Sequence, residues 1–533
     1  MQKQSISFKE TGYFSELICD YLDENELLKS FYNRFPNIDA FKFQMEEKTA
    51  SFKLKNRNVL VENIQKQYKN LEASAVTLAN IESLLQPNTF TITTGHQLNL
   101  FTGPLYFLFK IISTINLTKQ LKTAYPEHNF VPVYWMATED HDFDEINYFN
   151  FKGKKVVWNK DASGAVGALS TIGLEAVFNV ISSEFGTSKH AEYLKKLFKS
   201  AYLEHENLAE ATQYLVNELF KDYGLVIIDA NQRELKHVFA PYIKEELLNN
   251  SAFKTVSKTN EALLKTSSSY KIQVNPREIN LFYLDENLRE RIVFEDEVYK
   301  VLNTTITFSE SEILKHLEEV PERFSPNVIM RPLYQEVILP NLCYIGGGGE
   351  LAYWFQLKDF FNDVKVPFPI LLLRNSALLQ NENQFKKLKN LNVSLKHLFL
   401  NKHAFINKRV RDISNINIDF SNQKEHLKKQ FKELYTLAEQ TDKSFLGAVK
   451  AQEVKQVKGL EVLEKRLLKA QKRKLKDDIE RATIIKDELF PNQSLQERHI
   501  NFSQMYLEFG DGLIKSLFSI LNPLESTFFV LCV

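Results

Sequence analysis

Short runs of apolar, β-branched and aromatic residues recur along the first 380 positions of the chain. They occupy residues 90–93, 130–137, 223–230, 343–345 and 367–373, and such runs are typical of buried strands. After the first run, Pro104 precedes apolar residues at helical spacing, so we expect a helix that begins at Pro104 and lies on a sheet. Strands that alternate with helices predict a parallel sheet built from right-handed units.

The segments around these runs have other patterns. Residues 1–85 have mixed polarity with apolar residues three to five apart, which predicts helices. Residues 149–170 indicate a glycine-containing, β-rich insertion, and a helical stretch follows to about residue 220. Charged and apolar residues alternate over 270–301, which favours a small antiparallel meander as a second insertion.

Beyond Gln380 the composition shifts to Lys, Glu, Gln and Leu. Apolar residues three or four apart mark an amphipathic helix over 427–437 and a longer one over 460–489, which predict an antiparallel helical hairpin or short coiled coil. A basic run over 465–474 fits a solvated face, and RNA binding is less favoured because no aromatic residues are interleaved. The apolar tail 526–533 predicts a strand that docks on the fold.

These patterns divide the chain into seven segments. We expect N-terminal helices and the first half of the core in 1–148, a β-rich then helical insertion in 149–220, a core strand and helix in 221–260, a second insertion in 261–322, the second half of the core in 323–380, a helical coiled-coil domain in 381–515 and a docking tail in 516–533.

Composition narrows the function classes. A chain of 533 residues is too long for one compact core. Lys plus Arg equals Asp plus Glu at 67 each, which argues against nonspecific nucleic-acid binding. The three cysteines, Cys19, Cys343 and Cys532, form no CxxC pair, so we expect neither disulfides nor a structural zinc site. With no secretion signal and no apolar run of bilayer length, we expect a cytoplasmic protein without a membrane partner.

The first candidate site follows the strand at 90–93. We expect Thr94-Gly95-His96-Gln97 to break that strand and Thr102-Gly103 to lead into the next helix. A strand, a glycine-containing loop and a helix start aim free backbone N–H groups at an anion. An ordinary strand-to-helix turn would have the same pattern.

The second candidate site is the acidic cluster Glu139-Asp140-His141-Asp142, directly after the strand at 130–137. Ligands of open α/β sheets bind beyond the carboxyl ends of strands. Carboxylates and an imidazole there could coordinate a divalent cation, bind an amine, or act as acid and base. The alternative is an acidic first turn of a helix, favoured by the helix dipole.

The third candidate site combines the glycine run 346–349 with two arginines. The run lacks the ending of a phosphate-binding P-loop and does not match the dinucleotide fingerprint. Arg331 and Arg374 are candidates for anchoring a carboxylate or phosphate, because arginine binds either in a bidentate manner. Ser376 adds a hydroxyl at the same strand end. Structural salt bridges are the alternative role of the two arginines.

Three stretches together resemble one family. They are Thr94-Gly95-His96-Gln97 with Leu100 to Tyr106, Pro132 to Asp142, and Arg331-Pro332 with Gln335-Glu336 and Ile345 to Trp354. In order and spacing they are similar to the cysteine-adding enzymes of bacillithiol biosynthesis, the cysteine ligases. That family usually has Gln at position 96, and the His here makes the loop more like the HIGH loop of class I nucleotidyltransferases.

The resemblance implies a Rossmann-like, nucleotidyltransferase-type core with two connective insertions and an α-helical coiled-coil domain that forms a homodimer. The implied enzyme is a ligase that joins L-cysteine to the amine of glucosaminyl-malate, the last step to bacillithiol. ATP and Mg²⁺ are the implied cofactors, with a cysteinyl-adenylate or cysteinyl-phosphate intermediate, and no metal ligand set in the protein itself is expected.

The resemblance also implies roles for residues. His96 and Thr102-Gly103 would hold an anion, and the cluster 139–142 would receive amines and supply the base. The implied catalytic residues are His96, Asp140, His141 and Asp142, and the implied binding residues are Thr94, Gly95, Gln97, Thr102, Gly103, Tyr134, Trp135, Glu139, Arg331, Gln335, Gly346, Gly347, Glu350, Tyr353, Arg374 and Ser376.

Two other classes of function stay open. One is a non-catalytic nucleotide-binding scaffold whose coiled coil recruits partners, although a scaffold has no reason to gather His96, Arg374 and an acidic cluster at strand ends. The other is an enzyme like an aminoacyl-tRNA synthetase, for which Arg374-Asn375-Ser376 is the nearest counterpart of the missing KMSKS-like loop. The sequence does not assign the activating group, the general base or the thiol that is made.

Overall fold

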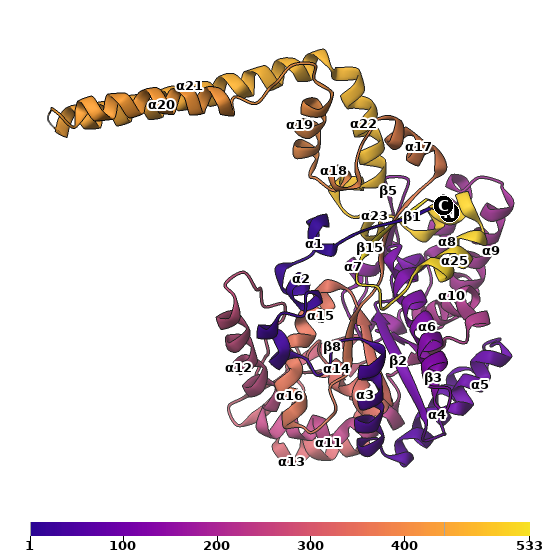
Figure 1. The fold of residues 1–533 in the computed structure, drawn as a ribbon. Helices are drawn as coiled ribbons and strands as arrows, with labels where there is room; N and C mark the ends of the chain where they lie inside the picture. Colours follow the sequence, from indigo (N-terminus) through magenta and orange to yellow (C-terminus); the bar gives the residue numbers. More distant parts are fainter. Residues whose placement is uncertain (1, 442, 533) are drawn as a thin grey trace.

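The computed structural model describes residues 2–441 and 443–532. Met1, Asp442 and Val533, which belong to the predicted segments 1–148, 381–515 and 516–533, lie outside the described residues. A body built around a parallel sheet carries a long helical arm that extends away from it (Figure 1).

The central sheet consists of β2 (Thr89–His96), β3 (Asn129–Met136), β6 (Val226–Asp229), β12 (Asn341–Gly346) and β13 (Ile370–Leu373). Its order is β13-β12-β2-β3-β6, and every neighbouring pair is parallel. This is the doubly wound order of a Rossmann-like fold, and it reverses between β2 and β12. The predicted Rossmann-like α/β core is confirmed.

The turn expected at Thr94-Gly95-His96-Gln97 is wrong in its position. β2 continues through Thr94 and Gly95 to His96, because its pairing with β3 runs on until His96 lies opposite Met136. The chain leaves the sheet only at Gln97. His96 is therefore held by a strand rather than by a loop.

The helix expected from Pro104 begins later, as α6 (Tyr106–Ala124). Pro104 instead forms a β-bridge with Asn501, and the N–H of Leu105 donates to the carbonyl of Ile500 at 2.8 Å. Thr102 and Gly103 have φ values of 68° and 63° and end a short 3₁₀ turn. The helix start predicted at Thr102-Gly103 is therefore wrong, because a segment near the C-terminus holds this loop open.

Helices of the first hundred residues pack around the sheet. They are α1 (Phe8–Thr11), α2 (Glu16–Leu22), α3 (Ile38–Ser51), α4 (Leu54–Gln67) and α5 (Ala75–Ser83). The later core helices are α14 (Met330–Ile338), α15 (Gly348–Trp354) and α16 (Lys358–Asp363).

Two insertions interrupt the core. Between β3 and β6 lie α7 (Phe143–Ile146), the hairpin β4 (Tyr148–Phe151) and β5 (Lys154–Val157), and α8 (Leu174–Glu184), α9 (Lys189–Tyr202) and α10 (Leu208–Phe220). After β6 come α11 (Arg233–Asn249), α12 (Ser251–Thr266), β7 (Leu281–Asp285), β8 (Leu288–Glu295), β9 (Val298–Val301), β10 (Thr307–Phe308), α13 (Glu310–Glu319) and β11 (Phe324–Pro326). These last five strands form an antiparallel sheet of order β10-β9-β8-β7-β11.

The two ends of the chain meet in a separate small sheet. It consists of β1 (Gln2–Ile6), β14 (Ser376–Gln380) and β15 (Phe528–Cys532). The C-terminal strand β15 is central, antiparallel to β1 and parallel to β14. Buried Phe528 and Phe529 anchor the tail in the main core.

The arm is formed by α20 (Ser421–Ala438) and α21 (Lys443–Lys474), which lie side by side (Figure 1). Phe431, Ala438 and Val449 form its small core. Shorter helices join it to the body: α17 (Glu382–Asn390), α18 (Leu395–Leu398), α19 (Lys402–Ile413) and α22 (Lys476–Leu489). The last three helices, α23 (Gln496–His499), α24 (Phe502–Phe509) and α25 (Gly512–Ile520), pack on the body itself.

The single helix expected over 460–489 is wrong, because α21 ends at Lys474 and α22 begins at Lys476. Arg409 of α19 pairs with Asp478 in the first turn of α22, and Ile479 packs in a cluster with Val410. These contacts turn the chain back toward the body. None of the described helices combines the length and the apolar character needed to cross a bilayer.

Candidate active site

A cavity of about 970 Å³ lies at the carboxyl ends of the central strands, where the strand order reverses. Its lining brings together all three candidate sites of the sequence. The predicted residues in the lining are Gly95, His96, Gln97, Trp135, Glu139, Asp140, His141, Asp142, Arg331, Gly347, Glu350, Tyr353 and Arg374.

The lining has an excess of positive charge in a chain whose formal net charge is zero. Its acidic side chains are Glu139, Asp140, Asp142 and Glu350, and its basic side chains are Lys110, Arg277, Arg289, Arg291, Arg331, Arg374 and Arg498. A concave site with this balance attracts anionic ligands.

Arg374, directly after β13, is 4% exposed. Its Nη2 donates to Glu497 Oε1 at 2.8 Å, and its Nη1 donates to the Asn375 carbonyl and to Ser376 Oγ at 2.9 and 3.1 Å. The guanidinium also lies 4.6 Å from the centre of the Tyr106 ring. Its Nε is buried and has no hydrogen-bond partner. A fixed cation thus keeps one donor free.

Arg331 of α14 has the same character. Its Nη1 donates to Gln335 Oε1 at 3.1 Å, and its guanidinium lies between the rings of Trp135 and Tyr344, 5.8 and 5.6 Å from their centres. Its Nη2 is buried without a partner. Leaving a buried charged donor unpaired is costly, so such a donor is a natural contact for a ligand.

Lys110 of α6 closes the floor of the cavity. Its Nζ donates to the Gly95 carbonyl at 2.6 Å and to Glu350 Oε1 at 2.7 Å. The other oxygen of Glu350 accepts the Gly347 N–H at 2.5 Å. Burial lowers the pKa of Lys110, and Glu350 opposes that shift. The pair joins the end of β2 to the glycine run after β12.

His96 is buried and neutral. Burial, and then the positive charges of Lys110 and Arg374, hold its pKa well below the usual range. A hydrogen bond to the Thr102 backbone acts in the opposite direction, and Nε2 has no partner. His96 therefore does not hold an anion by charge.

The segment 139–142 forms an acidic wall of the cavity, and Asp140 is the residue in it that accepts the most hydrogen bonds. It accepts hydrogen bonds from Gln97 Nε2 at 3.0 Å and from the His141 N–H at 2.8 Å. Burial works to raise its pKa, but the hydrogen bonds from Gln97 and from the His141 backbone N–H, together with the charge of Arg289, outweigh it and hold the pKa below its usual range. Asp140 therefore stays ionised.

The side chains next to Asp140 differ in whether hydrogen bonds or ion pairs already use their polar atoms. Arg289 Nη1 donates to His141 Nδ1 at 2.7 Å. Because arginine is only a donor, that nitrogen carries a lone pair, and its 3.7 Å contact with Asp140 is not a hydrogen bond. Glu139 is paired with buried Lys236 at 2.7 Å. Asp142 is 56% exposed, and its Oδ1 lies 4.0 Å from His141 Nε2.

Ligand atoms of Asp140, His141 and Asp142 lie within 4.8 Å of one another. They do not form a metal site as they stand. The lone pair of His141 Nδ1 is used by the cationic Arg289, and the oxygens of Asp140 accept from Gln97 and from the backbone. A divalent ion at this point would also lie next to a guanidinium.

The remaining predicted residues lie outside the lining: Thr94, Thr102, Gly103, Tyr134, Gln335, Gly346 and Ser376. Several of them support it instead. Gln335 and Ser376 accept hydrogen bonds from Arg331 and Arg374, and the Thr94 hydroxyl donates to the Ile345 carbonyl. Thr102 and Gly103 belong to the loop held by Asn501, whose Nδ2 donates to the Gly103 carbonyl at 2.6 Å.

Other lining residues were not predicted from the sequence. Lys110 left one signal, a lone cation in the apolar face of its helix. Arg289 and Arg291 lie in the charged run Arg289-Glu290-Arg291 of β8, a pattern that exposed strands also have. Nothing in the sequence pointed to Arg498, which reaches the cavity from near the C-terminus.

A Rossmann-like core with a charged cavity at its switch point and an appended helical arm places the chain among the α/β proteins that bind a ligand at the carboxyl ends of their strands. Comparison with known families makes this specific. Residues 1–375 match the N-terminal Rossmann-like domain of bacillithiol biosynthesis BshC, and residues 377–533 match its C-terminal coiled-coil domain. The chain belongs to the BshC family.

Relatives match over the full length. Proteins named "Putative cysteine ligase BshC" from Flavobacterium johnsoniae and Christiangramia forsetii are 59% and 57% identical to it, covering 100% of this chain and 100% and 99% of their own. One of the same name from Staphylococcus haemolyticus is 30% identical over 98% of this chain and 97% of its own. The resemblance drawn from the sequence and the expectation of a ligase are confirmed.

Proposed function

We propose that this chain forms the amide bond between the carboxyl group of L-cysteine and the amine of glucosaminyl-malate, with the switch-point cavity as its active site. Family membership and the names of the relatives support a cysteine ligase. The observation that carries the assignment of the site is that buried arginine donors without partners and the carboxylates of 139–142 line the same cavity.

The anionic parts of the substrates fit the arginines. Arg331 and Arg374 each keep a buried N–H donor, which suits a carboxylate or phosphate held away from water. Arg277 and Arg291 of the second insertion also line the cavity, and among the described residues neither side chain forms an ion pair. We assign these two to the carboxylates of the malate group.

The amine fits the acidic wall. When the C–N bond forms, the attacking nitrogen must lose a proton to a nearby base. Glu139 is occupied by Lys236, and Asp140 by Gln97 and the backbone. Asp142 is the carboxylate of this wall with the freest oxygens, so we assign it as the group that takes the proton.

A free carboxylate is a poor acceptor for an amine, and ATP would supply the activation by making its oxygen a better leaving group. The residues present fit the phosphates of a nucleotide, because Arg374, Arg498 and Gly347 to Gly349 line one part of the cavity. They do not fit a resident metal ion, so Mg²⁺ would arrive with the nucleotide. The protein's own part is to hold the carboxyl and the amine in contact and to accept the proton.

The test is an incubation of purified protein with L-cysteine and glucosaminyl-malate, with and without ATP and Mg²⁺, followed by mass spectrometry. We expect an amide product only when ATP is present. Product without ATP would contradict the activation step, and no product from folded protein in any mixture would favour the scaffold alternative.

We also propose that the arm forms a homodimer. Leu434, Leu437, Val462 and Leu463 of the arm are exposed, and burial of such residues in a helical interface would stabilise a dimer. Light scattering after size exclusion should give twice the mass of the chain. Leu437→Lys together with Val462→Lys should give monomers, whereas a monomeric wild type would contradict the proposal.

A further inference from the structure

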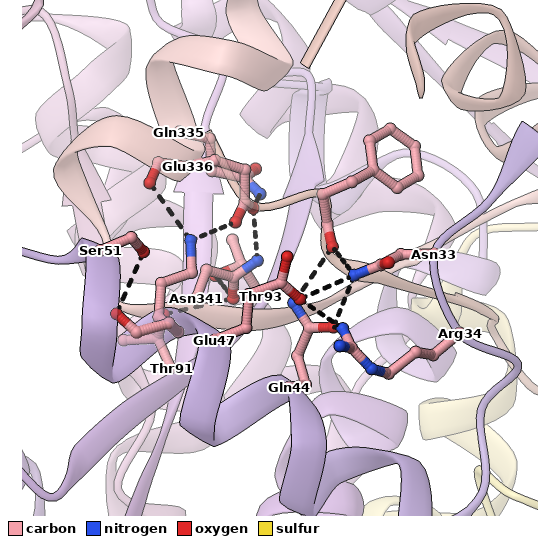
Figure 2. Close-up of polar contacts among 12 residues, drawn as sticks. Asn33, Arg34, Gln44, Glu47, Ser51, Thr91, Thr93, Gln335, Glu336 and Asn341 are labelled. Carbon is pink, nitrogen blue, oxygen red and sulfur yellow. Dashed lines mark hydrogen bonds and ion pairs between the residues drawn. The ribbon is translucent and has the colours of Figure 1, made fainter. Parts of the chain in front are cut away.

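A buried polar network joins Gln335 to helix α3 (Figure 2), and Gln335 in turn accepts a hydrogen bond from Arg331. Gln335 Nε2 donates to Glu336 Oε1 at 3.0 Å, and Lys48 Nζ donates to Glu336 Oε2 at 3.0 Å. Lys48, Gln335 and Glu336 are at most 1% exposed. A buried ion pair is therefore two hydrogen bonds away from a cavity arginine, through Gln335.

The carboxylate of Glu336, which can only accept, sets the direction of the hydrogen bonds in this network. Thr91 and Thr93 donate to Asn341 Oδ1 at 3.2 and 2.8 Å, which turns the Asn341 amide nitrogen toward Glu336 Oε1, at 2.6 Å. A carboxylate only accepts, so Gln335 must also present its nitrogen to Glu336. The Gln335 oxygen is then left to face Arg331, as observed.

A neutral amide at position 336 would remove this constraint. With its oxygen turned to the Lys48 cation, its nitrogen would take the place of Oε1 and meet the amide nitrogens of both Asn341 and Gln335. Thr91 and Thr93 hold the Asn341 amide, so Gln335 is the amide that turns. Its nitrogen would then face the guanidinium of Arg331, and two donors repel. The carboxylate itself depends on Lys48, since a buried carboxylate without a partner is strongly disfavoured. The Lys48–Glu336 ion pair thus fixes the orientation of the Gln335 amide, and that amide fixes the position of the Arg331 guanidinium.

We propose that Glu336 and Lys48 are positioning residues for Arg331, and that they act through the orientation of the Gln335 amide. The proposal rests on the proposed function in one respect, that Arg331 contacts an anionic substrate. Neither residue lines the cavity. Their effect is to keep the unpartnered Nη2 of Arg331 aimed at a fixed point, which preorganises the site.

Crystal structures of the wild type and of Glu336→Gln provide a test that needs no activity. We expect the Gln335 amide to turn and the Arg331 guanidinium to leave its contact with Gln335, while the α14 backbone stays in place. An unchanged Arg331–Gln335 contact would overturn the proposal. This holds whether or not the protein proves to be a ligase.

Calorimetric titration with L-cysteine, glucosaminyl-malate and ATP in turn tests the consequence for binding. Arg331→Lys identifies the ligand that Arg331 holds. Glu336→Gln should weaken the same ligand about tenfold, the cost of losing one well-placed bond to a charged group, and leave the others unchanged. Both changes act on the same contact, the one between Arg331 and its ligand. The variant that combines Arg331→Lys with Glu336→Gln should therefore bind no more weakly than Arg331→Lys alone.

Folding is separated from positioning by Lys48→Met combined with Glu336→Gln. This pair leaves no buried charge, so its melting temperature should recover relative to Lys48→Met alone, while the affinity stays weakened. Affinity that recovers together with stability would show a purely structural role and overturn the proposal. Glu47→Gln is the matched control, since Glu47 lies on the same helix and bonds to Asn33 and Arg34 instead (Figure 2), and it should change no affinity.

Discussion

The two walls of the cavity are built differently. The basic wall consists of Lys110 and Arg374, which are buried, and of Arg331, which is half-buried. Each of the three is held by hydrogen bonds to other residues of the protein. The acidic wall lies on the irregular segment 139–142 after β3, and its members range from paired Glu139 to half-exposed Asp142.

Because of this difference, we expect the basic wall to bind the anionic groups and the acidic wall to take up the proton. A fixed, buried cation with one free donor binds an anion at little cost in reorganisation, because its other bonds are already made. A half-exposed carboxylate with free oxygens can take up a proton and release it to water. Changes in the basic wall should therefore cost stability and binding together, whereas a change at Asp142 should cost only rate.

The largest effect is expected at Arg374. Arg374→Met leaves the fully buried carboxylate of Glu497 without its cation, which should lower the free energy of unfolding by about 3–5 kcal/mol and abolish ligation. Urea unfolding and the ligation assay measure the two effects.

Adding Glu497→Gln to Arg374→Met separates the loss of stability from the loss of ligation. The amide oxygen at 497 can still accept the Ala377 N–H, which Glu497 accepts at 2.9 Å, so stability should return without ligation. The matched control is Arg277→Met: this cavity arginine has no ion pair among the described residues, and its loss should leave stability within about 0.5 kcal/mol. Equal destabilisation by both changes would contradict the contrast between buried and free arginines.

The basic wall also shows how far the sequence could predict the site. Arg331 and Arg374 follow recognisable signals, a family motif and a strand end, and the order of strands brings such ends together. Their supports were only partly foreseen: Ser376 and Gln335 were predicted as ligand contacts, but the structure uses them to hold the arginines.

Other features depend on contacts between distant segments, which local patterns do not contain. The loop at Thr102-Gly103 resembles a helix start until Asn501 pairs with Pro104. Arg498 enters the cavity only because α23 packs on the strand after Arg374, through Glu497. The five core strands, in contrast, were predictable because each is an apolar run bounded by turn residues.

On the acidic wall, Asp142→Asn should lower kcat about 100-fold, the usual contribution of a positioned base. KM and the melting temperature should stay unchanged, because the side chain is half exposed and, among the described residues, lies no nearer than 4.0 Å to an ion-pair partner. Steady-state kinetics with both substrates measure this. Asp144→Asn, an exposed neighbour outside the cavity lining, is the control, and a similar loss in both variants would contradict the assignment of Asp142 as base.

The smallest effect is expected at Asp140, and it should depend on pH. Hydrogen bonds hold the pKa of Asp140 below its usual range in the folded protein, so its contribution to stability is fully present above the unfolded pKa of about 4 and is lost as pH falls toward the folded value. Asp140→Asn should therefore cost about 1–3 kcal/mol at pH 7, and the difference from wild type should shrink below pH 4. Urea unfolding at pH 7, 5 and 3 measures it. A difference that stays constant or grows toward pH 3 would show that Asp140 is not held as a carboxylate and would remove the anchor on which the acidic wall is built.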